Sequence, residues 1–121
     1  MDVLVLAGLE DSVNQDNAGT VKAGHVVEMA NGPVTKWAYD SLSKDGHVII
    51  PDIIANAGGV TVSYLEWVQN IENQRWTEDE VNAKLETYIK DAVRAMYEYA
   101  TEHHTSLKEA AFDVALQRLE A

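Results

Sequence analysis

Cysteine is absent from the 121 residues, which excludes a disulfide framework, a thiolate nucleophile and a cysteine-ligated metal site. Basic residues are scarce, because 9 Lys and Arg stand against 20 Asp and Glu and give a formal net charge of -11. Such a chain repels nucleic-acid phosphates and anionic lipid headgroups. We therefore expect neither nucleic acid nor a membrane as a partner.

Long apolar runs are also missing. No stretch approaches the roughly 18 apolar residues that a membrane span needs. The opening six residues, MDVLVL, lack the basic segment with which a signal peptide begins. We therefore expect a soluble, cytoplasmic protein. Its composition is typical of a folded domain, since 46% of the residues are hydrophobic and 24% are charged.

The first half of the chain has the pattern of a parallel β-sheet. Three short runs rich in β-branched residues, 3–6, 25–27 and 47–50, are separated by polar segments that can form helices. Consecutive parallel strands need crossover connections, and right-handed crossovers place the helices back on the sheet. The sequence therefore predicts an α/β arrangement with about three strands.

The two crossovers are predicted to differ in their helices. Residues 14–22 leave room for only a short helix before the chain reaches Gly24. In the second crossover, Pro33 fits the first position of a helix that ends near Gly46. The side chains expected on the core-facing side of this helix are Val34, Trp37, Ala38 and Leu42.

The second half is predicted to be helical and to belong to the same domain, residues 1–121. Apolar residues after Gly59 have helical spacing: Val60, Tyr64, Trp67, Val68 and Ile71. Two capping boxes, Thr77-x-x-Glu80 and Ser106-x-x-Glu109, predict the starts of two further helices. The adjacent His103 and His104 have no third ligand nearby in the sequence, so we predict no metal site.

Residues 51–67, PDIIANAGGVTVSYLEW, follow a predicted strand and open a predicted helix. They have the features of a binding turn. Gly58 and Gly59 allow close approach of the backbone to a ligand, and the amides at a helix N-terminus attract negative charge. Asn56 and Ser63 add polar groups that can donate or accept hydrogen bonds. The plain alternative is a glycine turn followed by a buried serine.

This stretch closely resembles the segment of glutamate dehydrogenases that leads from the cofactor domain into the substrate cleft. Two further runs are similar to the same family, DVLVLAGLE from Asp2 and VEMANGP from Val27. The tail resembles it too, with WTEDEV from Trp76 and VALQR from Val114. The resemblance implies half of a doubly wound, Rossmann-like parallel sheet over residues 1–57, followed by C-terminal helices over residues 58–121.

Family membership implies an enzyme that uses NAD or NADP to convert glutamate to 2-oxoglutarate. The residues that match its cofactor contacts are Ala7, Gly8, Ser12, Asn31 and Asn56. Of these, Asn31 and Asn56 match positions at the ribose and nicotinamide. Val60 and Ser63 match substrate contacts, where the serine hydroxyl helps to hold the side-chain carboxylate.

The resemblance also shows which family features these 121 residues lack. The Gly-x-Gly-x-x-Gly turn that cradles dinucleotide phosphates is absent. In the family, another domain supplies the catalytic lysine, the catalytic aspartate and the carboxylate-binding lysines, so no catalytic residue is assigned here. We expect this chain to be inactive alone and to bind a nicotinamide cofactor weakly or not at all.

Departures from the family pattern cluster beside the predicted strand ends. Met29 stands where the family has a glycine, a change expected to obstruct the cofactor. Nearby, apolar side chains replace mostly small or polar residues, which favours burial against a second copy. The expected homodimer interface contains Leu6, Met29, Val34, Trp37 and Tyr39. The alternative function is a non-catalytic, self-associating module, natural or engineered, that reuses the half-sheet scaffold.

Overall fold

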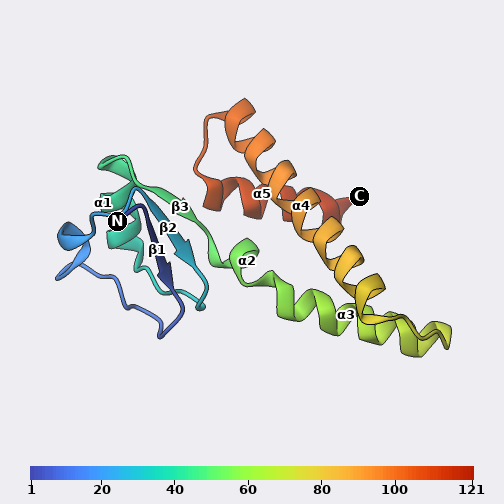
Figure 1. Cartoon of the computed structure of the whole chain (residues 1–121). Helices are drawn as coiled ribbons and strands as arrows, with labels where there is room; N and C mark the ends of the chain where they lie inside the picture. Colours follow the sequence, from blue (N-terminus) through green and yellow to red (C-terminus); the bar gives the residue numbers. More distant parts are fainter.

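A computed structural model describes residues 1–121 as a small sheet unit that leads into an extended set of helices (Figure 1). The elements are β1 (Val3–Leu6), η1 (Ala18–Thr20), β2 (His25–Glu28), α1 (Lys36–Lys44), β3 (Val48–Ile50), α2 (Asp52–Ala55), α3 (Ala57–Glu72), α4 (Glu78–His103) and α5 (Leu107–Glu120). The predicted α/β class, with a half-sheet followed by helices, is confirmed. None of the helices combines the length and the apolarity needed to cross a membrane.

The sheet has three parallel strands in the order β1-β2-β3. Its register places Val3 beside His25 and Leu6 beside Glu28 on one side of β2, and Val27 beside Ile50 on the other. The central strand β2 extends one residue beyond the predicted run, to Glu28. Because all three strands are parallel, the loops that follow them lie along one edge of the sheet.

The helix of the second crossover begins later than predicted. The side chain of Thr35 caps α1 by accepting a hydrogen bond from the N–H of Ala38. Pro33 is not in the helix, because its carbonyl accepts the N–H of Val13 at 2.9 Å and this pairing keeps the chain extended. Trp37 is also not on the core-facing side, since its side chain is 56% exposed.

The first crossover contains only the 3-10 turn η1 instead of a short α-helix. Two asparagine side chains explain this difference, because they hydrogen-bond the backbone locally. The N–H of Asn14 donates to Asn17 Oδ1 at 2.8 Å, and the N–H of Asp16 donates to Asn14 Oδ1 at 3.0 Å. Such bonds satisfy backbone groups without a helix.

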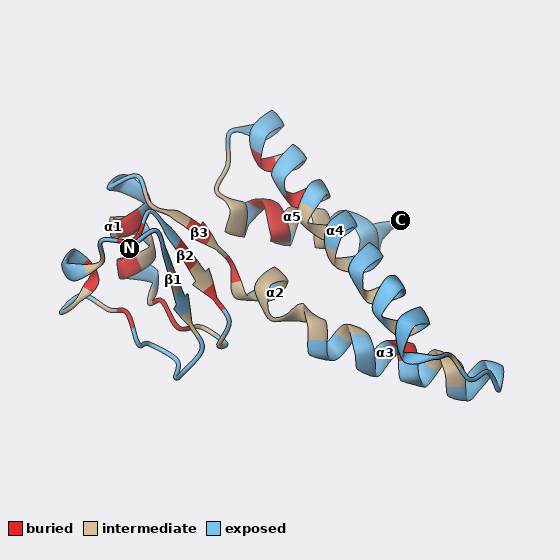
Figure 2. Cartoon of the chain, viewed as in Figure 1, coloured by how far each residue is buried: buried red, intermediate tan, exposed pale blue.

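Buried residues gather in two places (Figure 2). The larger cluster lies between the sheet and α1 and contains Val13, Ala18, Val26, Val34, Ala38, Leu42 and Ile49. The smaller cluster lies where α4 crosses α5 and contains Met96, Ala100, Ala110 and Ala111. Both capping boxes form as predicted and begin these two helices at Thr77 and Ser106.

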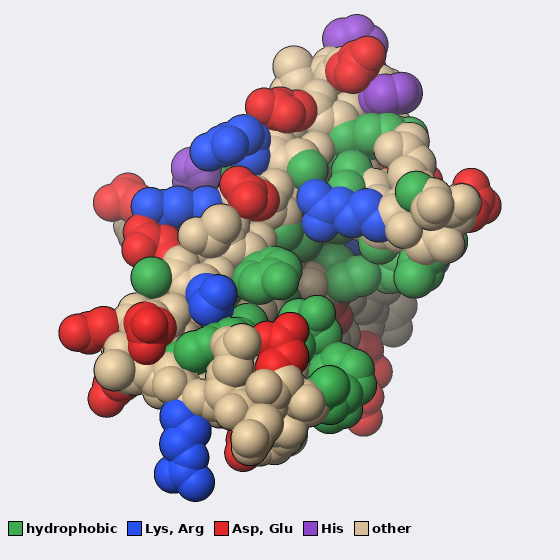
Figure 3. Space-filling view, turned by 90° about the vertical axis from the view of Figure 1, so that its right-hand side faces the viewer, with side chains coloured by type: hydrophobic (Ala, Val, Ile, Leu, Met, Phe, Trp, Pro, Cys, Tyr) green, Lys and Arg blue, Asp and Glu red, His purple; other side chains and the backbone are tan.

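The apolar residues predicted for α3 do not form a core-facing stripe. Val60, Trp67 and Ile71 are 70%, 58% and 63% exposed, and only Leu65 of this helix is buried. Figure 3 shows the side of the molecule that lies to the right in Figure 1, where hydrophobic side chains adjoin one another and charged side chains lie around them. The short helix α2, which the sequence pattern did not predict, connects β3 to α3.

Candidate functional site

Five of the seven predicted site residues follow the carboxyl ends of the strands. Ala7, Gly8 and Ser12 come after β1, Asn31 comes after β2, and Asn56 comes after β3 and α2. In open α/β sheets, ligands bind in the crevice outside this edge. The topology therefore places the predicted cofactor residues where such a fold binds its ligands.

The structure brings two of these residues into direct contact. The side-chain amide Nδ2 of Asn56 donates to Oδ1 of Asn31 at 2.7 Å, across 25 positions of sequence. In this contact the side-chain N–H groups of Asn31 and the Oδ1 of Asn56 have no protein partner. The pair therefore presents donors and an acceptor side by side, which suits a carboxamide or the hydroxyls of a ribose.

The loop after β2 is fixed at its start by the end of β1. The N–H groups of Met29 and Ala30 donate to the carbonyl of Leu6 at 2.9 and 2.8 Å. Two residues later, Gly32 has a positive φ of 55°, a conformation that favours glycine. Asn31 therefore stands in a short, sharply turned loop at the edge of the sheet.

A buried ionic contact lies behind this loop. Glu28, at the end of β2, is fully buried, and its Oε2 accepts the N–H of Asp52 at 3.1 Å. Lys108 of α5 lies 3.6 Å from the same oxygen and 5.3 Å from the ring of Tyr39. Burial raises the pKa of Glu28 above its ordinary value, and Lys108 and the Asp52 N–H offset only part of that rise.

Sequence reasoning missed this network of Glu28, Asp52 and Lys108. One signal was available: Glu28 directly follows the β-branched run 25–27, and a carboxylate at the end of a buried central strand needs a partner. The identity of the partner was not available, because Lys108 is 80 residues away in sequence and meets Glu28 only through the packing of α5.

The remaining cofactor residues are not joined to the amide pair. Ala7 and Gly8 are exposed directly after β1. The Ser12 hydroxyl donates to the carbonyl of Leu9, so its proton is used within its own turn. No hydrogen bond connects Ser12 with Asn31 or Asn56.

The two predicted substrate residues lie on the first turns of α3. Val60 is 70% exposed, and Ser63 lies three residues later, also exposed, near the same face of the helix. The Ser63 hydroxyl donates to the carbonyl of Gly59 at 3.2 Å. It must turn away from that carbonyl to donate to a ligand, whereas its lone pairs are already free to accept.

The predicted dimer interface needs correction. Val34 is only 5% exposed and belongs to the sheet core, so it cannot contact a second copy. Leu6 and Tyr39 are partly buried and pack against the same core. Met29 and Trp37 remain exposed, at 42% and 56%. The five residues therefore do not form one exposed apolar surface.

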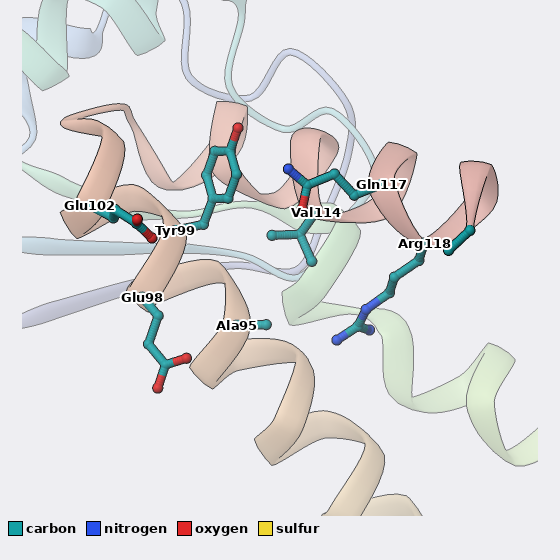
Figure 4. Close-up of a pocket in the computed structure, with 8 residues that line it drawn as sticks. Ala95, Glu98, Tyr99, Glu102, Val114, Gln117 and Arg118 are labelled. Carbon is teal, nitrogen blue, oxygen red and sulfur yellow. The ribbon is translucent and has the colours of Figure 1, made fainter.

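The hollow between α4 and α5 contains none of the predicted site residues (Figure 4). It has a volume of about 390 Å³, and its lining includes Glu98, Tyr99, Glu102 and Arg118. Two carboxylates and one guanidinium line it, a balance that does not favour the phosphates of a dinucleotide. The strand edge remains the better candidate.

Comparisons with known proteins show the family to which the chain is similar. A family model described as Glutamate/Leucine/Phenylalanine/Valine dehydrogenase matches residues 1–121. The chain is 51% identical over 120 residues to the NADP-specific glutamate dehydrogenase A1 of Halobacterium salinarum, covering 98% of this chain and 29% of that protein. It is 42% identical over 117 residues to the NAD-specific glutamate dehydrogenase of Staphylococcus aureus, covering 97% of this chain and 28% of that protein.

Solved structures give the same result. The hetero-hexameric glutamate dehydrogenase of Thermus thermophilus, in a Leu-bound form, superposes with a TM-score of 0.92 at 36% identity. The match covers 98% of this chain and 28% of that one. The chain thus spans less than a third of the length of each of these three relatives. These relatives support the dehydrogenase prediction and give no support to the self-associating module.

Proposed function

We propose that this chain, which belongs to the Glutamate/Leucine/Phenylalanine/Valine dehydrogenase family, forms the nicotinamide side of the cofactor site in a glutamate dehydrogenase. The observation that carries the proposal is the Asn31–Asn56 amide pair at the carboxyl edge of the sheet. Its free donors and acceptor match the polar groups of a nicotinamide ribose or carboxamide. The relatives include NADP-specific and NAD-specific enzymes, so the proposal covers the nicotinamide dinucleotides as a class.

We propose that the start of α3 forms one side of the substrate-binding site. Val60 and Ser63 are exposed there, a few residues after Asn56, so a substrate bound against them would lie beside the nicotinamide. The Ser63 hydroxyl would donate to the side-chain carboxylate of glutamate or 2-oxoglutarate. When bound, the dinucleotide supplies hydride transfer, and these residues orient the cofactor and the substrate toward each other.

The exposed face of α3 is proposed to pack against the rest of the enzyme. Tyr64 lies with its ring centroid 6.0 Å from that of Trp67 and 6.3 Å from that of Tyr88, which makes an aromatic cluster on the surface. A contiguous apolar patch of this kind marks an interaction site. The relatives contain more than twice as much further chain that could cover it. The Thermus enzyme is a hetero-hexamer, and we expect the completed protein to be oligomeric as well.

A chimera tests the function. The matching stretch of the Halobacterium enzyme is replaced by residues 1–121, and 2-oxoglutarate-dependent oxidation of NADPH is measured with ammonium present. We expect turnover from the chimera and none from the 121-residue chain alone, because the proton-transfer groups of the family are supplied elsewhere. Turnover by the chain alone, or an inactive but folded chimera, would contradict the proposal.

Point variants of the chimera assign the roles. Asn56→Ala should raise the KM for the dinucleotide about tenfold, and Ser63→Ala should raise the KM for 2-oxoglutarate by a similar factor, as expected for one lost hydrogen bond. Ser43→Ala, at an exposed position on α1, is the matched control and should change neither constant. Equal effects of Asn56→Ala and Ser43→Ala would remove the amide pair from the cofactor site.

A further inference from the structure

We propose that Asp52 is a positioning residue whose carboxylate holds the loop after β2 against α2 and thereby sets the geometry of the Asn31–Asn56 amide pair. The role of that pair in cofactor binding rests on the proposed function. The positioning itself rests on contacts within this chain.

Both oxygens of the Asp52 carboxylate accept backbone hydrogen bonds. Oδ2 accepts the N–H of Gly32 at 2.9 Å, and Oδ1 accepts the N–H of Ile53 at 2.8 Å. Gly32 is the neighbour of Asn31 in the loop. The carbonyl of Asp52 also accepts the N–H of Asn56 at 3.0 Å. One residue is therefore bonded to both sides of the amide pair.

On its other side the loop is held by the segment after β1, because the Gly32 carbonyl accepts the N–H of Asp11 at 2.9 Å. Gly32 has a φ of 55°, so its backbone lies in a region where glycine has great conformational freedom. Three side-chain hydrogen bonds join the β2 end and its loop to α2: Gly32 to Asp52, Asp52 to Glu28, and Asn56 to Asn31. Asp52 takes part in two of the three. Of these two, only the bond from Gly32 depends on the Asp52 carboxylate. Without that carboxylate, the amide pair and the bond from the backbone N–H at position 52 to Glu28 would be the remaining links of this kind between the loop and α2.

The backbone of Asp52 is in turn held by the side chain of Glu28. Its Oε2 accepts the Asp52 N–H at 3.1 Å, and Lys108 of α5 lies 3.6 Å from the same atom. A plain alternative is that Asp52 only complements the dipole of α2. That helix has four residues, so its dipole is small, and the bond to Gly32 crosses 20 positions of sequence without contributing to it.

The test measures the side-chain amides of Asn31 and Asn56 by NMR in the 121-residue protein without ligand. Asp52→Asn removes one acceptor and turns an NH₂ group toward a backbone N–H. We expect both side-chain amides to shift, and the Asn56 amide, which is the donor in the pair, to exchange with water roughly fivefold to tenfold faster, as for one lost hydrogen bond. Asp45→Asn is the control, because Asp45 is exposed and its side chain makes no hydrogen bond or ion pair.

A second variant keeps the test decisive if Asp52→Asn does not fold. Asp52→Ser retains an acceptor for the start of α2 but is one bond shorter, so it should lose Gly32 and give the same change in the amide pair. Methyl resonances of the buried Leu42 report whether the core is intact. Unchanged Asn31 and Asn56 amides in a folded variant whose Gly32 N–H has lost protection would overturn the proposal.

The chimera separates this inference from the proposed function. If the ligand-free amide pair shifts in Asp52→Asn but Asn56→Ala leaves the KM of the chimera for NADPH unchanged, the positioning role is supported and the cofactor role fails. If Asn56→Ala raises that KM but the amide pair keeps its wild-type shifts and exchange in Asp52→Asn, the cofactor role is supported and the positioning role is overturned.

Discussion

The sheet unit (residues 1–50) surrounds its core with branched side chains such as Val26, Leu42 and Ile49, whereas the helical segment (residues 57–121) joins α4 to α5 mainly through Met96 and three alanines. The large apolar side chains of the helical segment point outward instead. Trp67 and Leu116 are 58% and 55% exposed. The sheet unit is thus stabilised by a core of large side chains, and the helical segment by a smaller cluster and by local capping.

The largest expected effect tests the sheet core. Leu42→Ala should lower the free energy of unfolding by about 3 kcal/mol, because the side chain is 1% exposed and its loss leaves a cavity. Leu116→Ala makes the same chemical change at a 55% exposed site and should cost less than about 0.5 kcal/mol. Urea unfolding of both variants measures the difference. Similar losses would break the comparison.

The next effect tests the contact between the two regions. Lys108→Met leaves the buried Glu28 without its counter-charge and should cost roughly 2 kcal/mol at neutral pH, somewhat less than for a fully buried pair because Lys108 is partly exposed. Lys36→Met removes an exposed pair with Asp40, at 3.7 Å, and should cost less than about 0.5 kcal/mol. Equal costs would mean that the buried contact does not hold the regions together.

The pH dependence of the stability of the Lys108→Met variant has a defined sign. Burial raises the pKa of Glu28 above 4.5, so folding favours the protonated form. The stability that Glu28 contributes is present below pH 4.5 and is lost as the pH rises through the raised pKa. Removing Lys108 raises the pKa further and enlarges that loss. The cost of Lys108→Met should therefore shrink on acidification, and a cost independent of pH would contradict this explanation.

A smaller effect tests the capping of the helical segment. Thr77→Ala and Ser106→Ala should each cost about 1 kcal/mol, the usual value for a lost N-cap. Thr87→Ala is the control, since its hydroxyl only bonds the Ala83 carbonyl within α4, and it should cost less than about 0.5 kcal/mol.

The caps should respond to pH in the direction opposite to Glu28. Hydrogen bonds from the Thr77 and Ser106 backbone amides lower the pKa values of Glu80 and Glu109 below 4.5. Their contribution is present above pH 4.5 and is lost as the pH falls through the lowered values. Helix fraying monitored by amide exchange should therefore begin at the α4 and α5 N-termini on acidification. Fraying that begins in the sheet unit would reverse the comparison.

The smallest effects come from two tryptophans of similar exposure. In the 121-residue chain, Trp37→Glu and Trp67→Glu should each change the free energy of unfolding by less than about 0.5 kcal/mol, since the rings are 56% and 58% exposed. In the chimera, only Trp67→Glu should block assembly, because Trp67 lies in the aromatic cluster of α3 whereas Trp37 stands among Asp40, Ser41 and Lys44. A loss of mass in sedimentation caused by Trp37→Glu would instead favour the homodimer prediction.

The sequence predicted those elements whose signals are local. The three strand runs and both capping boxes appear within one residue of their expected positions, because β-branched runs and cap hydrogen bonds act over a few residues. The start of α1 was wrong, because the pairing of Val13 with Val34, 21 positions apart, kept Pro33 out of the helix. The outward orientation of α3 was missed because periodicity gives a face but does not say what that face contacts.

The sequence likewise predicted some residues of the candidate site and missed others. Asn31 and Asn56 came from the resemblance, and the structure then placed their amides 2.7 Å apart. Asp52, Glu28 and Lys108 belong to three separate parts of the chain, and no spacing rule connects them. Their association depends on how β2, α2 and α5 pack, which is tertiary information.

The edge strand β1 has a consequence for handling the protein in solution. It pairs only with β2, its residues Val3 and Val5 are about half exposed, and its free backbone groups can template pairing with other chains. At neutral pH the net charge of -11 keeps molecules apart, but the isoelectric point is near 4.5. Net intermolecular repulsion therefore vanishes at about the pH where the carboxylates discussed above titrate, so acid unfolding experiments need dilute protein to keep aggregation from imitating unfolding.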